Sequence, residues 1–279
     1  MLWACERKHE ATEIEQIQKS AAQGYAPSQF VLGMFYNIGR GVPKDDAKAV
    51  EWWQKAADQG LAAAQRNLGG MYANGIGVPE DQAKAFEWYQ KSAAQGDATA
   101  QSNLGWMYAN GIGVPKDEAK AFEWYQKAAA QGIAAAQSNL GVMYGEGSGV
   151  PKDEAKAFEW YQKAAAQGYA VAQFWLGTSY LTGIGVPKDE AKGAEWVQKS
   201  AAQGHAEAQN NLGKMYAIGI GVPKDEVQAY AWYNLAAANN YSDAIKNREI
   251  LEKTMTLDQK AAAQKLSMEL FGKIKKPPK

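Results

Sequence analysis

The chain has 279 residues, 46% of them hydrophobic and 22% charged, which is the balance of a folded protein rather than a disordered one. Its 30 basic and 30 acidic side chains cancel, so the net charge does not indicate binding to nucleic acid or to an anionic membrane surface. No apolar run is long enough to span a bilayer, and the single cysteine excludes a disulfide framework and a thiolate metal site. We therefore expect no nucleic acid partner, membrane span, metal or cofactor.

The N-terminal residues leave two cellular locations open. Residues 1–10 lack the apolar stretch of a secretory signal, so we expect a cytoplasmic protein if Met1 is the true start. The run from Leu2 to Cys5, however, resembles the end of a bacterial lipoprotein signal, and an anchor on Cys5 would make the protein a periplasmic lipoprotein. Residues 1–24 as a whole are predicted to be a lead-in and capping helix, because 11–24 match only half of the repeat that follows.

A motif of 36 residues then recurs six times over residues 25–240 without a slip. Leu-Gly and Val-Pro pairs both keep this spacing. The Val-Pro pairs begin at Val42, Val78, Val114, Val150, Val186 and Val222. Such a period predicts a solenoid, in which stacked units share one continuous core.

Each unit is predicted to form two helices. In the third unit the first helix is expected over 98–109, and glycines such as Gly111 then end it, because glycine enters left-handed backbone conformations without steric cost. Pro115 is expected to begin the second helix and Asp117 to cap it. The second helix should then continue over 118–130.

Two further columns of the repeat are predicted to lie in the core. Trp124 shares a helical face with Ala121 and Ala128, so the equivalent tryptophans should pack between helices rather than form a cofactor site. They are Trp52, Trp88, Trp124, Trp160, Trp196 and Trp232. Gly105 and its copies lie in the middle of the first helix, where glycine costs about 1 kcal/mol relative to alanine, and this indicates a close approach of helix backbones.

The C-terminal end departs from the repeat. Residues 241–253 replace the first helix of a unit, and Thr256 and Gln259 form a predicted capping box that opens a final helix over roughly 257–271. We expect 241–272 to cover the last hydrophobic face and residues 273–279 to be a basic tail.

The motif Ala-Gln-x-x-Leu-Gly-x-Met-Tyr, followed by Gly-x-Gly-Val-Pro-x-Asp and Lys-Ala-x-x-Trp-Tyr-x-Lys-Ala-Ala-x-Gln-Gly, resembles the Sel-one-like repeat, a relative of the tetratricopeptide repeat. The resemblance implies an all-α fold, an α/α solenoid forming a right-handed superhelix of helix-turn-helix repeats. It also implies an adaptor or scaffold that binds another protein or peptide. Some bacterial relatives are immunity proteins that neutralise secreted effectors. Others bind cell-wall precursors, but those carry paired cysteines, which this chain lacks.

Positions that vary between the six copies indicate where a partner would bind. On the first helix the third, sixth, seventh, tenth and fourteenth residues of the unit vary and fall on one arc, opposite the invariant columns. First helices line the concave side of such solenoids, so this arc is the predicted groove. Four units carry asparagine at the seventh position, namely Asn67, Asn103, Asn139 and Asn211. These amides are predicted either to bind an extended peptide or to bond loops of their own units.

Other groove candidates are aromatic or charged. Trp106 lies outside the tryptophan column and is a candidate anchor, while Arg66 and Lys214 are candidates for contacts with an acidic group. Units one and five interrupt the asparagine series with apolar residues, which we expect to be exposed interaction sites. They are Phe30, Met34, Phe174 and Trp175. The alternative for the last two is that one of them folds inward to replace bulk lost from the second helix of unit five.

No catalytic constellation is evident. His9 and His205 have no cluster of titratable partners nearby in sequence, and the Gly-x-Gly-Val-Pro loop lacks the strand and the Lys-Ser/Thr of a phosphate loop. We therefore predict a monomeric binding protein and no enzyme. A self-associating structural spacer is the alternative, and a cell-wall hydrolase the least favoured one.

Overall fold

The computed structural model describes residues 2–274, with side chains from residue 12 onward. These residues form fifteen helices and no strand. The predictions made for Cys5 and for the C-terminal lysines 275, 276 and 279 fall outside the side chains that are described.

The six repeats form six helix pairs, and every helix in them has 13 residues. The first helices are α2 (Ala26–Ile38), α4 (Ala62–Asn74), α6 (Ala98–Asn110), α8 (Ala134–Glu146), α10 (Ala170–Thr182) and α12 (Ala206–Ile218). The second helices are α3 (Asp46–Asp58), α5 (Gln82–Ala94), α7 (Glu118–Ala130), α9 (Glu154–Ala166), α11 (Glu190–Ala202) and α13 (Glu226–Ala238). In the third repeat three of the four bounds are as predicted, and the first helix ends at Asn110, one residue later than expected.

The loop between the paired helices has the predicted chemistry, with one correction. Gly111 ends α6 in the left-handed region at φ 69°. The Asp117 carboxylate accepts a hydrogen bond from the backbone N–H of Lys120 at 3.0 Å, as an N-cap should. The prediction for Pro115 was wrong, because α7 begins only at Glu118, after the cap, and the proline lies in the preceding loop.

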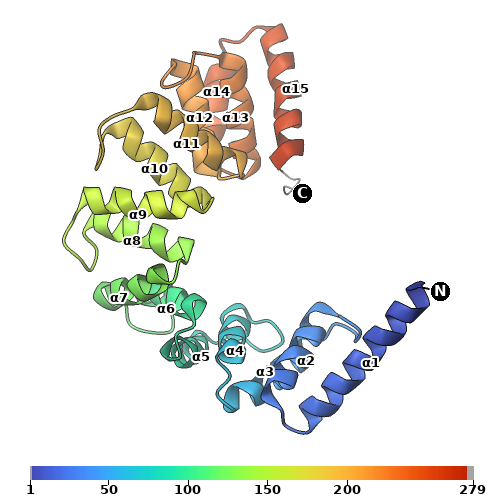
Figure 1. Cartoon of the computed structure of the whole chain (residues 1–279). Helices are drawn as coiled ribbons and strands as arrows, with labels where there is room; N and C mark the ends of the chain where they lie inside the picture. Colours follow the sequence, from blue (N-terminus) through green and yellow to red (C-terminus); the bar gives the residue numbers. More distant parts are fainter. Residues whose placement is uncertain (1, 275–279) are drawn as a thin grey trace. The chain divides into compact units, whose positions relative to one another are not determined.

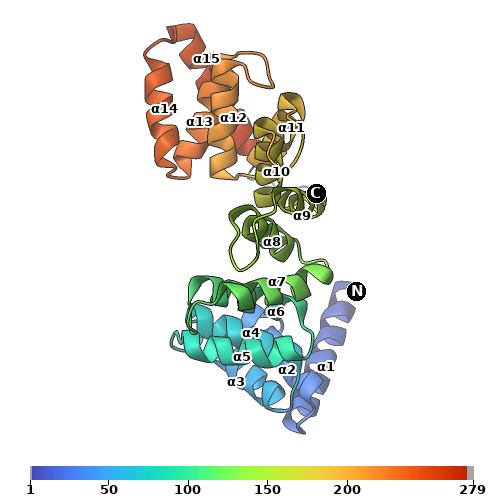
Figure 2. The same cartoon turned by 90° about the vertical axis from the view of Figure 1, so that its left-hand side faces the viewer.

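Helices that follow one another in the chain are neighbours within each part of it, among them α2 with α3 and α12 with α13 (Figure 1). The chain divides into two compact units, residues 1–136 and 137–279. In the first unit α3 lies against both α2 and α4, and α5 lies against both α4 and α6. In the second unit α10 packs on α9 and α11, and α12 on α11 and α13 (Figure 2). This pairing confirms the all-α, α/α solenoid.

The residue that fills the core on each second helix follows the tryptophan column by one position. Tyr125 is 3% exposed and lies against Gly105, where a Cβ atom would stand only 2.6 Å from the Tyr125 Cδ1 atom. In this repeat the mid-helix glycine therefore accommodates a ring of the paired helix. In the fifth repeat, by contrast, a Cβ atom on Gly177 would lie 2.9 Å from the backbone oxygen of Gly193, which is the close backbone approach that was predicted. The six equivalent residues are Trp53, Tyr89, Tyr125, Tyr161, Val197 and Tyr233, opposite Gly33, Gly69, Gly105, Gly141, Gly177 and Gly213.

The tryptophan column itself is mostly half-buried, so the prediction that it lies in the core was too strong. Only Trp232 is buried, at 4% exposure. Trp124 packs beside the core that α5 and α6 form, and the Lys127 Nζ atom covers its ring at 4.1 Å from the centroid. The same cation–π pair recurs, with distances of 3.9–4.1 Å, at Trp52, Trp88, Trp160 and Trp196. The alanine face of the helix continues through the tyrosine, which explains why the tryptophan lies at its edge.

A column of buried glutamines ties neighbouring repeats together. Gln101 is 6% exposed, and its Nε2 donates to the carbonyl oxygen of Ala93, in the preceding helix, at 3.2 Å. Its Oε1 accepts from the Nε2 of Gln131 at 2.8 Å. Both ends of the buried amide are thus satisfied, as a polar group in a core requires. Equivalent glutamine pairs occur in the first, second, fourth and fifth repeats.

Three helices lie outside the six pairs. At the N-terminal end α1 (Leu2–Ala22) packs on α2, and at the C-terminal end α14 (Ser242–Glu252) and α15 (Leu257–Ile274) both pack on α13. The predicted capping box is confirmed: Gln259 Oε1 accepts from the Thr256 N–H at 2.8 Å, and Thr256 Oγ1 accepts from the Gln259 N–H at 3.2 Å. The final helix continues three residues beyond the predicted end at 271.

Candidate functional site

In the second repeat the residue at the sixth position, Arg66, faces the next repeat. Arg66 Nη1 lies 3.0 Å from the Asp97 Oδ2, and Asp97 is the first residue of the following repeat. The Arg66 side chain is 34% exposed and that of Asp97 14%, so the ion pair lies at the edge of the stacking surface. Arg66 was predicted to contact an acidic group of a partner, but its guanidinium already binds an acid of its own chain.

Phe174 occupies the same position in the fifth repeat, and its predicted exposure was wrong. The side chain is 2% exposed and lies in the core with Ala194 and Val197 of α11. Its ring centroid is 5.2 Å from that of His205, the first residue of the sixth repeat. Because α11 carries small residues where other repeats carry larger ones, the phenylalanine fills the volume, as the alternative interpretation stated.

The two candidate residues of the first repeat differ in their burial. Phe30, also at the sixth position, is half-buried, and its ring lies 6.5 Å from that of Trp53. Its carbonyl oxygen accepts a hydrogen bond from the Trp53 Nε1 at 3.1 Å. Met34, at the tenth position, is 39% exposed and free of this packing. Lys214, at the tenth position of the sixth repeat, is exposed as well.

The seventh position contacts the tyrosine of the preceding repeat. The Asn103 side chain lies beside the Tyr89 hydroxyl, so this asparagine faces a tyrosine of its own chain. In the fifth repeat the seventh residue is Trp175, which stacks on Tyr161 with ring centroids 6.1 Å apart and an interplanar angle of 17°. The remaining asparagines, Asn67, Asn139 and Asn211, are half-buried at equivalent positions.

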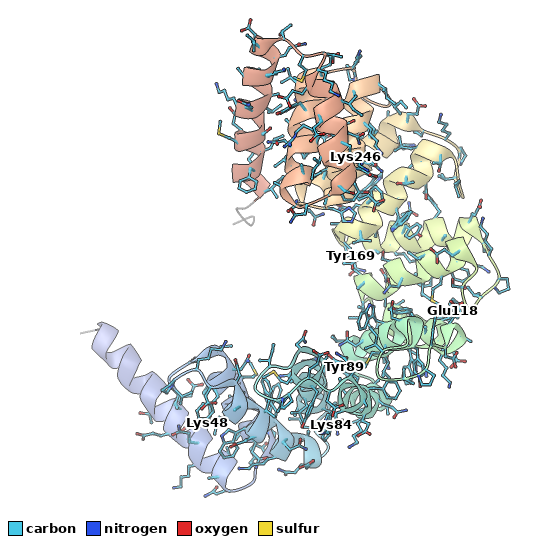
Figure 3. All side chains as sticks on the ribbon, turned by 180° about the vertical axis from the view of Figure 1, so that it is seen from behind. Lys48, Lys84, Tyr89, Glu118, Tyr169 and Lys246 are labelled. Atoms are coloured by element: carbon cyan, nitrogen blue, oxygen red, sulfur yellow. The ribbon has the colours of Figure 1, made fainter. Side chains whose placement is uncertain are left out.

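A cavity of about 230 Å³ opens at the junction of the second and third repeats, and we call it the junction 2/3 pocket. Amide side chains line it, and so does Tyr89 of α5, which is labelled in Figure 3. Trp106 stands at the rim with 49% of its surface exposed. The residues lining the cavity are Ala73, Asn74, Gln82, Tyr89, Asn103, Trp106, Met107 and Ile112.

A cavity of about 220 Å³ occurs at the equivalent place between the fourth and fifth repeats, and we call it the junction 4/5 pocket. Trp175 and Tyr161 line it where Asn103 and Tyr89 line the other. Its distinctive members are Gly145 and Glu146, which occupy the positions of Ala73 and Asn74. The remaining lining residues are Val142, Lys152, Glu154, Ala157, Thr178, Ser179, Thr182 and Ile184.

The two tyrosines differ in their electrostatic surroundings. Burial raises the pKa of Tyr89, while the Asn103 side chain and the positive charge of Arg66 oppose that rise. Burial also raises the pKa of Tyr161, and the negative charge of Glu146 raises it further. Within the described residues the Tyr161 hydroxyl has no hydrogen-bond partner, although the side chain is only 7% exposed. The hydroxyl therefore remains free to bond a molecule that enters the pocket.

Of the predicted site residues, the structure brings Asn103 and Trp106 together at one pocket and places Trp175 at the other. The others line neither pocket. Sequence reasoning missed the tyrosine column and the Gly145-Glu146 pair. Both were detectable: the tyrosines keep the 36-residue spacing, and Glu146 is the one acid at the fourteenth position of the six repeats.

The residues that the structure describes carry neither a metal cluster nor a candidate membrane span. No group of three or more metal-ligating His, Cys, Asp or Glu side chains occurs among them. In the same part of the chain, no helix combines the length and apolar character needed to cross a membrane.

Comparisons with known proteins agree with the repeat geometry. The model of the Sel1 repeat matches six consecutive segments: 26–61, 62–97, 98–133, 134–169, 170–205 and 206–241. Among solved structures, a Sel1 repeat protein from Oxalobacter formigenes is 32% identical with a TM-score of 0.77, over 84% of this chain and 94% of the other. The protective antigen c5321 of uropathogenic Escherichia coli, which displays an SLR fold, is 29% identical with a TM-score of 0.50, over 93% of this chain and 87% of the other. None of the curated proteins matches the chain.

Proposed function

Because this chain belongs to the Sel1 repeat family, we propose that it is a binding protein whose partner, another protein or a peptide, docks at the pockets between repeats. Helical repeat arrays present extended surfaces of this kind, and the family membership supports interaction with proteins. Neutralising a secreted effector, the alternative that the resemblance implies, would be one form of such binding.

The observation that carries the proposal is the position of Trp106. Half of its surface is exposed, it lies on the rim of the junction 2/3 pocket, and amide side chains line the wall beside it. Tryptophan is one of the residues enriched among those that contribute most of the binding energy in protein interfaces. The tryptophans of the second helices differ from it, because a lysine covers each of their rings in the first five repeats.

Partner capture with a Trp106→Ala variant tests the proposal. The full chain is immobilised, and proteins retained from the source cell are compared with those retained by the variant. We expect the affinity for the partner to fall about thirtyfold or more, because loss of a central aromatic anchor typically costs about 2 kcal/mol or more.

Tyr25→Ala is the matched control, since Tyr25 is an aromatic residue with 61% exposure that lines neither pocket. It should leave retention unchanged. If Trp106→Ala retains every specific partner as well as the unmodified chain does, the pocket at this junction is not the docking site.

A further inference from the structure

The junction 4/5 pocket has features that no other repeat junction combines, and all of its residues belong to the unit formed by residues 137–279. Gly145 stands where the other repeats carry Asn, Ala, Ala, Leu and Ala. A Cβ atom there would lie 3.7 Å from the Ala157 Cβ and 3.8 Å from the Tyr161 hydroxyl, which is ordinary contact. The glycine is therefore not required by packing. Its effect is to leave space in front of the hydroxyl.

The charge at the rim of this pocket is unbalanced. Lys152 Nζ lies 2.8 Å from the Glu154 Oε1, so these two side chains neutralise each other. Glu146 has no basic partner among the described residues, and its one polar contact is with the Ser148 hydroxyl, which donates to Oε2 at 3.5 Å. The pocket thus presents one uncompensated carboxylate beside a buried hydroxyl without a partner.

The inner wall is flat and apolar. The Trp175 ring lies parallel to that of Tyr161, and Val142, Ala157 and Ile184 complete the lining. An aromatic wall with a carboxylate at its edge suits a group that is planar, positively charged and carried on an apolar stem. Among protein side chains only arginine combines these properties, because its guanidinium both stacks on rings and donates several hydrogen bonds to a carboxylate.

We infer that the junction 4/5 pocket binds an arginine side chain of the partner, with the guanidinium between the Trp175–Tyr161 stack and the carboxylate of Glu146. The Tyr161 hydroxyl accepts one of its N–H bonds, and the methylenes lie on the apolar wall. This inference rests on the proposed function, which it deepens by stating what the partner presents to the second unit of the chain.

A titration with short blocked peptides tests it directly. The probes are acetyl-Gly-Arg-Gly-amide, the same peptide with citrulline, which has the shape of arginine without the charge, and the same peptide with lysine. The readout is the indole N–H resonance of Trp175 in a nitrogen–proton NMR spectrum, assigned by its loss in Trp175→Phe. We expect saturable binding of the arginine peptide with a Kd on the order of millimolar, and binding at least about fivefold weaker for the other two.

Three variants locate the binding. Glu146→Gln removes the charge without changing the size, and Gly145→Ala fills the space in front of the hydroxyl, so both should weaken binding of the arginine peptide at least about fivefold. Neither is expected to unfold the chain, since alanine favours a helix more than glycine does. Glu118→Gln is the control for removal of one acid. Glu118, labelled in Figure 3, lies in the third repeat and pairs with Lys116, as Glu154 pairs with Lys152 in the fourth repeat.

The inference would be overturned if the citrulline peptide or the lysine peptide bound as tightly as the arginine peptide. So would full-strength binding to Gly145→Ala. These failures are distinct from failure of the proposed function: if Trp106→Ala loses the protein partner while Glu146→Gln keeps both partner and peptide binding, only the arginine assignment is wrong.

Discussion

The junction 2/3 and junction 4/5 pockets are built from the same positions of the repeat and differ in almost every chemical property. In both, a tyrosine of the second helix lies against the mid-helix glycine of its own repeat, Tyr89 on Gly69 and Tyr161 on Gly141. At the seventh position of the next repeat, however, one has an asparagine beside the tyrosine hydroxyl and the other a tryptophan that stacks on the ring.

The difference shows how a repeat protein separates its packing from its binding surface. The columns that build the floor keep nearly the same residues, so the cavity recurs with nearly the same volume. The seventh, tenth, thirteenth and fourteenth positions line the wall, and they change from amides with a protruding tryptophan to a carboxylate with an inserted one. Each junction can therefore recognise a different chemical group without altering how the repeats stack.

The largest effect expected from this comparison concerns the sixth position. Phe174→Ala should lower the free energy of unfolding by about 3–5 kcal/mol, because it leaves a cavity in the core beneath Val197. Arg66→Ala at the same position of the second repeat should cost about 1 kcal/mol or less, since it removes an ion pair that is partly exposed. Urea unfolding followed by far-UV circular dichroism measures both.

The Arg66 variant serves as the matched control for position in the repeat. A loss of less than about 1 kcal/mol for Phe174→Ala would contradict the buried placement. It would restore the original interpretation of that residue as an exposed binding group.

The sixth position also shows where sequence reasoning succeeded and where it did not. The 36-residue period predicted six helix pairs, their glycine ends and their aspartate caps, because those features depend on local backbone geometry. It misplaced Arg66 and Phe174, because variation between copies was interpreted as freedom from stacking. In fact each contacts the first residue of the next repeat, Asp97 or His205, and the two change together. A comparison of residues 31 positions apart would have detected these pairs.

Two adjacent glycines on α4, Gly69 and Gly70, test the packing of a tyrosine ring on a mid-helix glycine that both pockets share. Gly69→Ala should destabilise the chain by about 1–2 kcal/mol, because a Cβ there would lie 2.6 Å from the Tyr89 ring, and overpacking outweighs the gain in helix propensity. Gly70→Ala should instead stabilise it by up to about 1 kcal/mol, since its Cβ meets only the Tyr89 hydroxyl, at 3.6 Å. Urea midpoints of the two variants give the sign directly.

Gly141→Ala extends this test to the junction 4/5 pocket, where the equivalent tyrosine, Tyr161, lies on the equivalent glycine, Gly141. It should match Gly69→Ala in sign. If Gly141→Ala were stabilising, as Gly70→Ala is expected to be, the two pockets would not share a floor and the comparison between them would fail.

The smallest expected effect concerns the first residue of the repeat, which is Asp97 in the third repeat and His205 in the sixth. Burial lowers the pKa of His205 below its ordinary value near 6.5, and Glu207 opposes this only in part. The neutral Nδ1 accepts a hydrogen bond from the backbone N–H of Ala208 at 3.3 Å, and a protonated ring loses that acceptor. Because the folded state binds its proton less tightly than the unfolded state, the contribution of His205 is fully present above about pH 6.5 and is lost as the pH falls below it.

The urea midpoint should therefore decrease slightly between about pH 7.5 and about pH 5.5, relative to that of His205→Asn. Asparagine keeps a neutral helix cap at both pH values, so subtracting its pH profile removes the contributions of His9 and of the carboxylates. Identical profiles for the two proteins would show that the ring at the first position is solvated. The contact between Phe174 and His205 would then contribute nothing to the stacking of the fifth and sixth repeats.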